Sequence, residues 1–202
     1  MWALVESGSI TKFINSPKGL VIGDVRYSKK IFQLWSKSEL EAKGIYEVEM
    51  DNSKKKDEQW YINTNVTYAF GSGKVTGSYG DATAKAHADT LFTAQDETDG
   101  LGTEGEVKDR GLKYNLIRTV KKEAAQILQD TDWYITRKAD AGTAVPSSIT
   151  NHRAAVRTKA AEMETSITNA SDTPALQTLY TYTEQEDGSV TRPLGELPTL
   201  ED

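Results

Sequence analysis

Apolar and polar residues alternate most clearly between residues 60 and 70. One set of alternate positions is mostly apolar and consists of Trp60, Ile62, Thr64, Val66, Tyr68 and Phe70. The positions between them are mostly polar, which predicts a single strand of an antiparallel sheet that covers a core with one face. The next segment, GSGK (71–74), predicts a hairpin turn. A phosphate-binding loop would need Gly at position 68 and Ser or Thr at position 75, where the chain has Tyr and Val.

Shorter apolar runs occupy the first fifty residues. The runs at 2–6 and 10–14 flank Ser-Gly-Ser, which predicts a hairpin, and further strands are expected at 20–23 and 45–50. A different pattern separates the last two strands. There Ser36 and Glu39 match a capping box.

The capping box predicts a short helix over residues 36–44. Gly44 is suited to the left-handed residue that ends such a helix. Residues 81–97 have alanines at alternate positions, which predicts a short helix or an irregular connector. We therefore expect residues 1–97 to form a small, β-rich antiparallel module with one short helix. The Gly-rich segment 98–105 reads as a linker between domains.

A helical period begins after this linker. In 106–129 the apolar stripe contains Leu112, Leu116, Val120, Ala124, Ile127 and Leu128. A second helix should start near Pro146, and its stripe consists of Ile149, Arg153, Val156, Ala160, Met163 and Ile167. This stripe has the spacing of a coiled-coil seam. Residues 106–172 are therefore predicted to form a helical hairpin, with a short helical turn ended by Gly142 between its arms.

The last thirty residues are acidic. Residues 173–202 hold six acidic residues and one base, Arg192. Within them, 178–194 reads as two strands around Asp187-Gly188, a pair suited to a type I′ turn. The complete prediction is an α+β fold: a β-rich N-terminal module, a long helical hairpin, and a short C-terminal β-hairpin or tail. The C-terminal hairpin is expected to contact another subunit or partner.

Composition limits the classes of function. The chain has 202 residues, a net charge of −6 and no cysteine, which excludes disulfides and thiolate chemistry. A basic face for nucleic acid and an apolar run that spans a membrane are both missing from the sequence. The two histidines, His87 and His152, lack partners at metal-ligand spacing, and no motif for catalysis or cofactor binding occurs. We expect a protein without enzymatic activity, metal or cofactor.

Two segments carry a resemblance to a known family. Residues 118–167, which include LQDTDWYITRKADAGTAVPSSITNHRAAVR, resemble the tail-assembly-chaperone type module of tailed bacteriophages. The matching positions are Leu128, Thr131, Asp132, Trp133, Pro146, Arg153 and Arg157. Residues 23–49 also look like the opening module of such proteins. Residues 58–100 and the tail carry no part of the resemblance.

The resemblance implies a non-enzymatic tail, baseplate or tail-fibre protein, located in the virion tail and assembled in the host cytoplasm. Its partners would be other tail or fibre proteins and further copies of itself. A transient assembly chaperone is the alternative. A third hypothesis is a carbohydrate-binding module on a helical stalk that uses Trp60, Tyr61 and Tyr68.

The joint between the two long helices is the candidate site. Thr131 or Asp132 is suited to cap the short helical turn, and Trp133 is expected to be mostly buried there. Arg137 and Arg153 are expected to bridge to Asp132 or to carbonyl groups at a helix end. The complete candidate interface consists of Trp133, Arg137, Arg153, Val156, Met163, Tyr180 and Tyr182.

Overall fold

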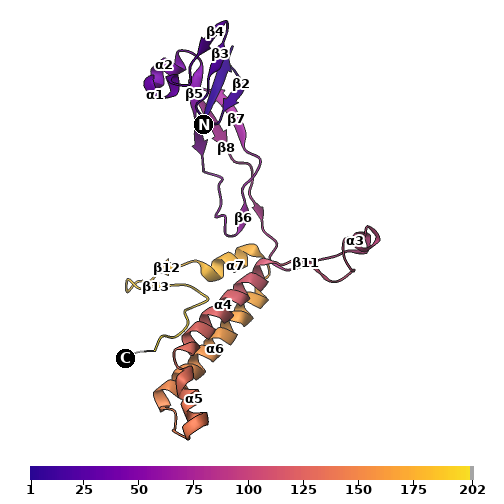
Figure 1. Ribbon diagram of the computed structural model, residues 1–202, viewed down its shortest axis with the longest axis vertical. Helices are drawn as coiled ribbons and strands as arrows, with labels where there is room; N and C mark the ends of the chain where they lie inside the picture. The colour runs from indigo at the N-terminus through magenta and orange to yellow at the C-terminus, as the bar shows by residue number, and fades with distance from the viewer. Residues whose placement is uncertain (201–202) are drawn as a thin grey trace. The chain divides into compact units, whose positions relative to one another are not determined.

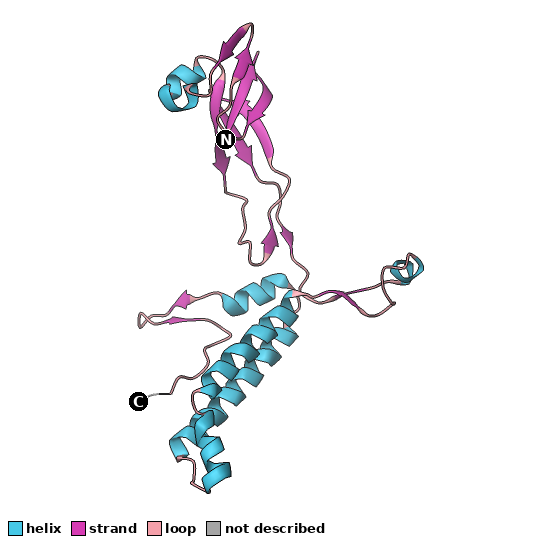
Figure 2. Ribbon diagram, in the orientation of Figure 1, coloured by secondary structure: helices cyan, strands magenta, loops and turns pink. Residues whose placement is uncertain are grey.

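The chain folds as a mixed α+β protein, as predicted, with a β-rich N-terminal part, long helices in the middle and a C-terminal β-hairpin (Figures 1 and 2). A computed structural model describes residues 1–200. They form two compact units, Met1–Thr83 and the residues from Ala84 onward. The predicted linker 98–105 lies inside the second unit, between two of its secondary structure elements. The units therefore divide before this Gly-rich segment.

A five-stranded sheet forms the centre of the first unit. Its order is β2 (Ser9–Ile14), β1 (Trp2–Glu6), β5 (Ile45–Asp51), β8 (Lys74–Ser78) and β7 (Thr67–Gly71). Three neighbouring pairs are antiparallel, but β5 and β8 are parallel, which corrects the expectation of a purely antiparallel sheet. Parallel neighbours need a long connection between them. The residues between β5 and β8, which include the excursion 52–66, supply it.

The predicted continuous strand over 60–70 is wrong. It is divided into β6 (Tyr61–Ile62) and β7, and Asn65 between them has a positive φ of 57°. Asparagine tolerates this left-handed conformation better than most residues, so the chain turns away there. Trp60 and Tyr61 are consecutive yet both buried, which a simple strand alternation does not allow. β6 pairs with β9 (Thr83–Ala84), where the chain passes into the second unit.

The core of the first unit lies on both faces of β1. One face contributes to a cluster of Leu4, Ile14, Leu20, Ile31, Leu40 and Ile45. The other face packs Ala3 and Val5 against Val75. Burial on both faces explains why this strand is continuously apolar in sequence. The cluster also uses small elements, of which β3 (Leu20–Ile22) was predicted, whereas β4 (Val25–Tyr27) and α1 (Ile31–Leu34) were not.

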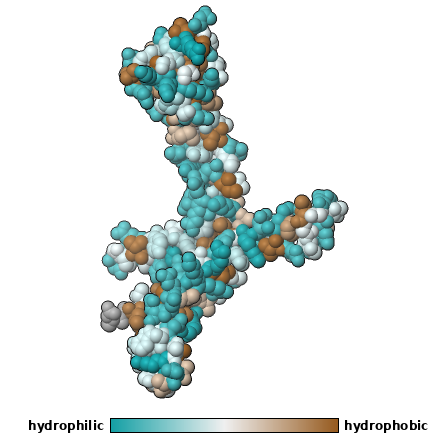
Figure 3. Space-filling model, viewed as in Figure 1, coloured by the Kyte–Doolittle hydropathy of each residue, from teal (hydrophilic) through white to brown (hydrophobic). Residues whose placement is uncertain are grey.

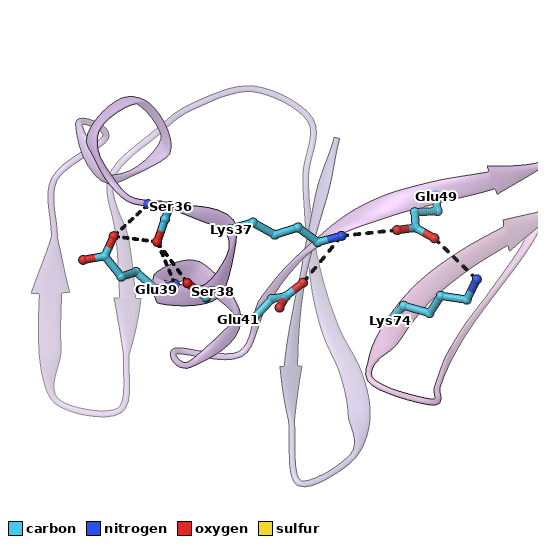
Figure 4. A network of polar contacts seen from close by, with 7 residues as sticks. All are labelled: Ser36, Lys37, Ser38, Glu39, Glu41, Glu49 and Lys74. Carbon is cyan, nitrogen blue, oxygen red and sulfur yellow. Dashed lines mark hydrogen bonds and ion pairs between the residues drawn. The ribbon is translucent and has the colours of Figure 1, made fainter.

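The predicted capping box is present at the start of α2 (Lys37–Glu41). The Ser36 hydroxyl accepts a hydrogen bond from the Glu39 amide, and the Glu39 carboxylate accepts one from the Ser36 amide at 2.8 Å (Figure 4). On the strand side, Glu49 lies between two ammonium groups. Lys37 and then Lys74 donate hydrogen bonds to its carboxylate, which lowers the pKa of Glu49 below its usual value. These contacts connect α2 to the neighbouring strands β5 and β8.

Gly44 joins α2 to β5 and takes the predicted left-handed conformation, with φ of 76°. A Cβ atom there would lie 2.4 Å from the carbonyl oxygen of Val5. The same approach allows the Val5 amide to donate to the Gly44 carbonyl at 2.7 Å. The position therefore excludes a side chain for two independent reasons.

Replacing Gly44 with Ala should destabilise the first unit by about 3 kcal/mol, from left-handed strain plus the backbone clash. Gly73 is the matched control, because its φ is 72° but a Cβ atom there meets nothing within 4 Å. The Gly73→Ala variant should lose only about 1 kcal/mol. Urea unfolding of both variants measures the difference. Equal losses would mean that the clash with Val5 relaxes without cost.

The second unit is built on two long helices, α4 (Leu112–Gln129) and α6 (Ser147–Asn169), which pack side by side. Every predicted position of the second stripe is buried, from Ile149 to Ile167. The helix predicted from residue 106 begins only at Leu112, because β11 (Val107–Asp109) comes first and Gly111 is the N-cap. Among the described residues, no helix is long and apolar enough to cross a membrane.

Shorter elements complete this unit. They are β10 (Thr90–Leu91), α3 (Ala94–Thr98), α5 (Asp132–Ala141), α7 (Thr173–Tyr180), β12 (Thr183–Glu184) and β13 (Val190–Thr191). α7 occupies part of the segment predicted as a strand, so the C-terminal hairpin is shorter than expected. Its turn is not type I′, because Gly188 has a positive φ but Asp187 does not. The Gly188 amide donates to Gln185 instead, as in a type I turn that ends in a left-handed Gly.

Candidate docking site at the helical joint

Arg153 organises the joint where α4 ends and α5 begins. Its side chain is buried, and one guanidinium nitrogen donates to the Leu128 carbonyl at 2.7 Å and to the Thr131 hydroxyl at 2.6 Å. Another nitrogen donates to the Asp132 carboxylate at 2.8 Å. Arg153 was predicted to bridge to Asp132 or to a helix-terminal carbonyl, and it makes both contacts. One residue of α6 thus fixes the end of α4 and the start of α5.

The predicted capping of α5 is correct only at its C-terminus. Gly142 ends the helix in the left-handed conformation, with φ of 66°. Thr131 occupies the N-cap position, but its hydroxyl donates to the Leu128 carbonyl at 3.0 Å and makes no cap to the α5 amides. The same oxygen also accepts a hydrogen bond from Arg153, so its contacts join α4 to α6 and do not reach the α5 amides. Asp132 lies one residue inside the helix, where its charge favours the positive N-terminal end.

Trp133 is not mostly buried, contrary to the prediction. Its side chain is 51% exposed. The Trp133 ring lies against Tyr134, and the Arg137 guanidinium lies 4.7 Å from the Trp133 ring centroid. Arg137 therefore stacks on aromatic rings and does not bridge to Asp132. Its Nε is buried and has no hydrogen-bond partner among the described residues.

The joint therefore has an inner and an outer side. The inner side is polar, and Arg153 donates hydrogen bonds to its acceptors. The outer side presents the half-exposed indole of Trp133, with the partly buried Arg137 guanidinium stacked on it. Trp and Arg are the residue types that most often dominate binding energy at protein interfaces. This outer side, defined by Trp133 and Arg137 one helical turn apart, is the candidate docking site.

Val156 and Met163 have a different role from the one expected of interface residues. Both are almost fully buried within the chain itself, in the seam of α6. His152 is buried on the same helix. These side chains hold the hairpin together and present nothing to a partner.

Tyr180 and Tyr182 form a second cluster with Arg192 and Glu196, which were not part of the predicted interface. The Arg192 guanidinium lies 5.3 Å and 5.2 Å from the two ring centroids. Arg192 pairs with Glu196, and the Tyr182 hydroxyl donates to the same carboxylate at 2.6 Å. Burial raises the pKa of Tyr180 to about 12. The position of Arg192 as the single base in an acidic tail was the available signal.

The C-terminal segment packs onto the helices. Leu194 is buried, and its amide donates to the carbonyl of Leu179 in α7. A Cβ atom on Gly195 would meet the side chain of Lys159 in α6. A hollow of about 370 Å³ remains beside this segment, lined by Glu123, Gln126, Ile127, Asp130, Met163, Arg192, Glu196 and Leu197. Its lining contains no nucleophile paired with a base, and residues 1–200 contain no cluster of metal-ligating side chains.

The aromatic residues proposed for carbohydrate binding do not form an exposed platform. Trp60 and Tyr61 are buried. Tyr68 packs against Phe13 across the edge strands of the sheet, with ring centroids 4.7 Å apart. Of the three, only Tyr68 keeps part of its ring open, at 37% exposed, whereas stacking on a sugar needs open ring faces.

Residues 90–109 form a projecting element, here called the finger. The sequence did not predict that this segment has a defined structure. It consists of β10, α3 and β11. Thr93 and Asp96 make a reciprocal capping box at the start of α3, and Lys108 binds the Asp96 carboxylate at 2.7 Å. The sequence signal was Thr-x-x-Asp at 93–96, hidden in a Gly-rich, acidic region. The finger is therefore braced by its own residues.

The finger should loosen in acid because of Asp96. Hydrogen bonds from Lys108 and then from Thr93 lower the pKa of Asp96 to about 2. Folding lowers the pKa of Asp96, so its ionised carboxylate stabilises the folded finger. This stabilisation is present above the unfolded pKa of about 3.9 and is lost as pH falls towards 2. NMR titration of the Leu101 amide, which donates to the Asp96 carbonyl, should show this transition.

Two variants test the assignment to Asp96. Asp96→Asn should remove the transition, whereas Asp99→Asn in the same segment should keep it. The Asp99 carboxylate accepts a hydrogen bond from the neutral Gln95 side chain. An unchanged titration in Asp96→Asn would show that another carboxylate controls the finger.

Compared with protein-family models, with curated proteins and with solved structures, the chain matches none of them.

Proposed function

We propose that this chain is a non-enzymatic protein of the bacteriophage tail, baseplate or tail-fibre region that connects or assembles other tail components. The proposal begins from the resemblance of residues 118–167 to the tail-assembly-chaperone type module. It places the protein in the virion tail, assembled in the host cytoplasm. Its partners are other tail or fibre proteins.

The observation that carries the proposal is that four of the seven motif positions meet at one point. Leu128, Thr131 and Asp132 all accept hydrogen bonds from Arg153. These four positions belong to the motif, although α5 and the Pro146 turn separate Arg153 from the other three. The motif therefore has a physical purpose, which is to fix the angle between α4, α5 and α6. A fixed joint holds Trp133 and Arg137 on a rigid surface, as a connector needs.

The division into two compact units agrees with a connector. Each unit has its own buried residues and its own hydrogen bonds and ion pairs. One chain can therefore bind two neighbours with two surfaces.

Mass spectrometry of purified phage particles tests the proposal. A connector should be present at a fixed copy number relative to a known tail protein. Abundance in the infected lysate together with absence from particles would instead establish the transient chaperone. Absence from both would contradict the whole proposal.

Trp133 should matter for assembly more than for folding. Because its side chain is half exposed, Trp133→Ala should cost less than about 1 kcal/mol of stability, whereas a buried Trp would cost 3–5 kcal/mol. Loss of a central interface anchor typically weakens binding by about 2 kcal/mol or more, roughly thirtyfold. Calorimetry and incorporation into particles during complementation measure the two effects.

The control for this variant is Tyr114→Ala. Tyr114 is another exposed aromatic residue of the second unit, covered on one side by Arg110. It should leave incorporation unchanged. Equal incorporation of both variants would remove Trp133 from the docking site.

A further inference from the structure

The finger, residues 90–109, is rigid without having a core. The Phe92 amide donates to the Glu106 carbonyl at 2.9 Å, and the Gly105 amide donates back to Phe92 at 3.0 Å. The Phe92 ring lies so close to Gly102 that a Cβ atom there would be 2.5 Å from it. Together with the Thr93 capping box and the ion pair of Asp96, these contacts fix the shape of the finger.

Apolar side chains remain exposed on this fixed shape. Leu101 is 61% exposed, Leu91 is 47% exposed and Val107 is 37% exposed. Leu91 and Val107 are register partners across the ribbon, so their side chains form one patch. Apolar surface is visible on the finger in Figure 3. A self-braced element that exposes three large apolar residues has the properties of a docking element.

The finger is also strongly acidic. Residues 90–109 contain six acids and one base, a net charge of −5. The base, Lys108, is already paired with Asp96. Glu104, Glu106 and Asp109 are exposed and make no ion pair with the described residues. The surface that covers the finger must therefore supply positive charge.

The outer face of α4 has the complementary charge. Residues 112–129 contain four bases and one acid, a net charge of +3. Arg118 and Lys122 lie one helical turn apart, are exposed, and make no ion pair within residues 1–200. A shallow depression continues this face and is lined by Lys122, Ala125, Gln126, Gln129 and Asp132. The small Ala125 leaves space there for an apolar side chain.

The root of the finger directs it away from its own α4. The Asp89 carboxylate accepts hydrogen bonds from the Gly111 amide at 2.8 Å and from Arg110. The Leu112 amide, at the first position of α4, donates to the Ala86 carbonyl. In Figure 1 the finger extends outward from the end of the α4–α6 hairpin. The complementary face must then belong to another molecule.

We propose that the finger of one copy docks on the Arg118–Lys122 face of α4 in a second copy. Glu104 and Glu106 would pair with the two bases, while Leu101 and the Leu91–Val107 patch cover the depression beside Ala125. The two surfaces differ, so the contact is heterologous and repeats from copy to copy. Such contacts close into rings when the rotation between copies allows it. The inference adds a partner to the proposed function but does not depend on it.

Charge reversal in the full-length chain tests this contact. The finger variant is Glu104→Lys with Glu106→Lys, and the face variant is Arg118→Glu with Lys122→Glu. Analytical ultracentrifugation in low salt should show concentration-dependent assembly of the unchanged chain. Each variant alone should assemble at least about tenfold more weakly, since like charges then face each other. A 1 M salt buffer should weaken the unchanged chain as well, because the Debye length falls to about 3 Å.

Mixing the two variants is the decisive measurement. Each mixed contact again places opposite charges together, so the equimolar mixture should recover assembly. Glu184→Lys with Glu186→Lys makes the same charge change in the acidic C-terminal hairpin and should leave assembly unchanged. Far-UV circular dichroism checks that all variants remain folded.

The proposal is overturned if the unchanged chain stays monomeric at every concentration. It is also overturned if the finger variant assembles normally, or if the C-terminal variant alone prevents assembly. In the last case the acidic hairpin is the ligand of α4. The proposed function is tested by the composition of phage particles, which none of these results measures. The finger contact and the proposed function can therefore fail separately.

Discussion

Arg153→Ala should lower the free energy of unfolding of the second unit by about 3 kcal/mol. The substitution removes the donors that satisfy the Leu128 carbonyl and the Thr131 hydroxyl. Both acceptors lie in a region where α4, α5 and α6 meet, and Thr131 itself is buried. The ion pair with Asp132 adds little, because that carboxylate is largely exposed to solvent.

Two variants separate the geometry of the guanidinium from its charge. Arg153→Lys keeps the charge but cannot reach three acceptors with one ammonium, so it should lose about 1–2 kcal/mol. Arg157→Ala removes an exposed arginine one turn later on α6 and should change stability by less than about 0.5 kcal/mol. Thermal unfolding measured by calorimetry gives all three values. A loss for Arg157→Ala equal to that for Arg153→Ala would assign the effect to net charge.

The helical seam could be predicted from sequence because its signal is local. Arg153 fits the apolar stripe from Ile149 to Ile167, and every stripe position is buried. Helical period depends on neighbours three and four residues away, so no distant partner has to be known. The charged residue in the stripe was the one informative break. It marks the polar joint.

Trp133 shows the limit of this reasoning. A large aromatic side chain between two helices favours burial, but burial needs an element opposite it. On α5 the indole lies against Tyr134 and Arg137, and both come from the same helix. Sequence indicates that the residue is apolar but not whether another element faces it. The exposed position is what makes it a docking candidate.

Pairings between distant strands could not be predicted either. The parallel contact of β5 and β8 depends on the path of the chain between them, and no local period encodes it. α7 had a local signal that was missed. Asp172 accepts a hydrogen bond from the Ala175 amide, and a proline follows in the first turn. The β-branched and aromatic residues of 178–183 favoured a strand and concealed this helix start.

Val156→Asp should have the largest effect of the substitutions considered, a loss of about 4 kcal/mol or more. Val156 is fully buried in the seam of α6, and an introduced carboxylate there has no cation within the stripe except Arg153, which is already bound. Val156→Ala should cost roughly 2 kcal/mol, the part that belongs to lost packing. Ala155→Asp is the control, because Ala155 is exposed on the same helix and should tolerate the charge. The difference between the losses of Val156→Asp and Val156→Ala measures the cost of burying a charge.

The pH dependence of the Val156→Asp variant identifies that charge cost. Burial raises the pKa of the introduced carboxyl in the folded state above its unfolded value of about 3.9. The penalty is therefore fully present above the folded pKa and decreases as pH falls towards the unfolded value, when both states are protonated. Urea unfolding at pH 7 and pH 4.5 should thus bring Val156→Asp closer to Val156→Ala at the lower pH. A constant difference between these two variants would mean that the carboxylate reaches water, and that the α4–α6 seam opens more readily than its burial indicates.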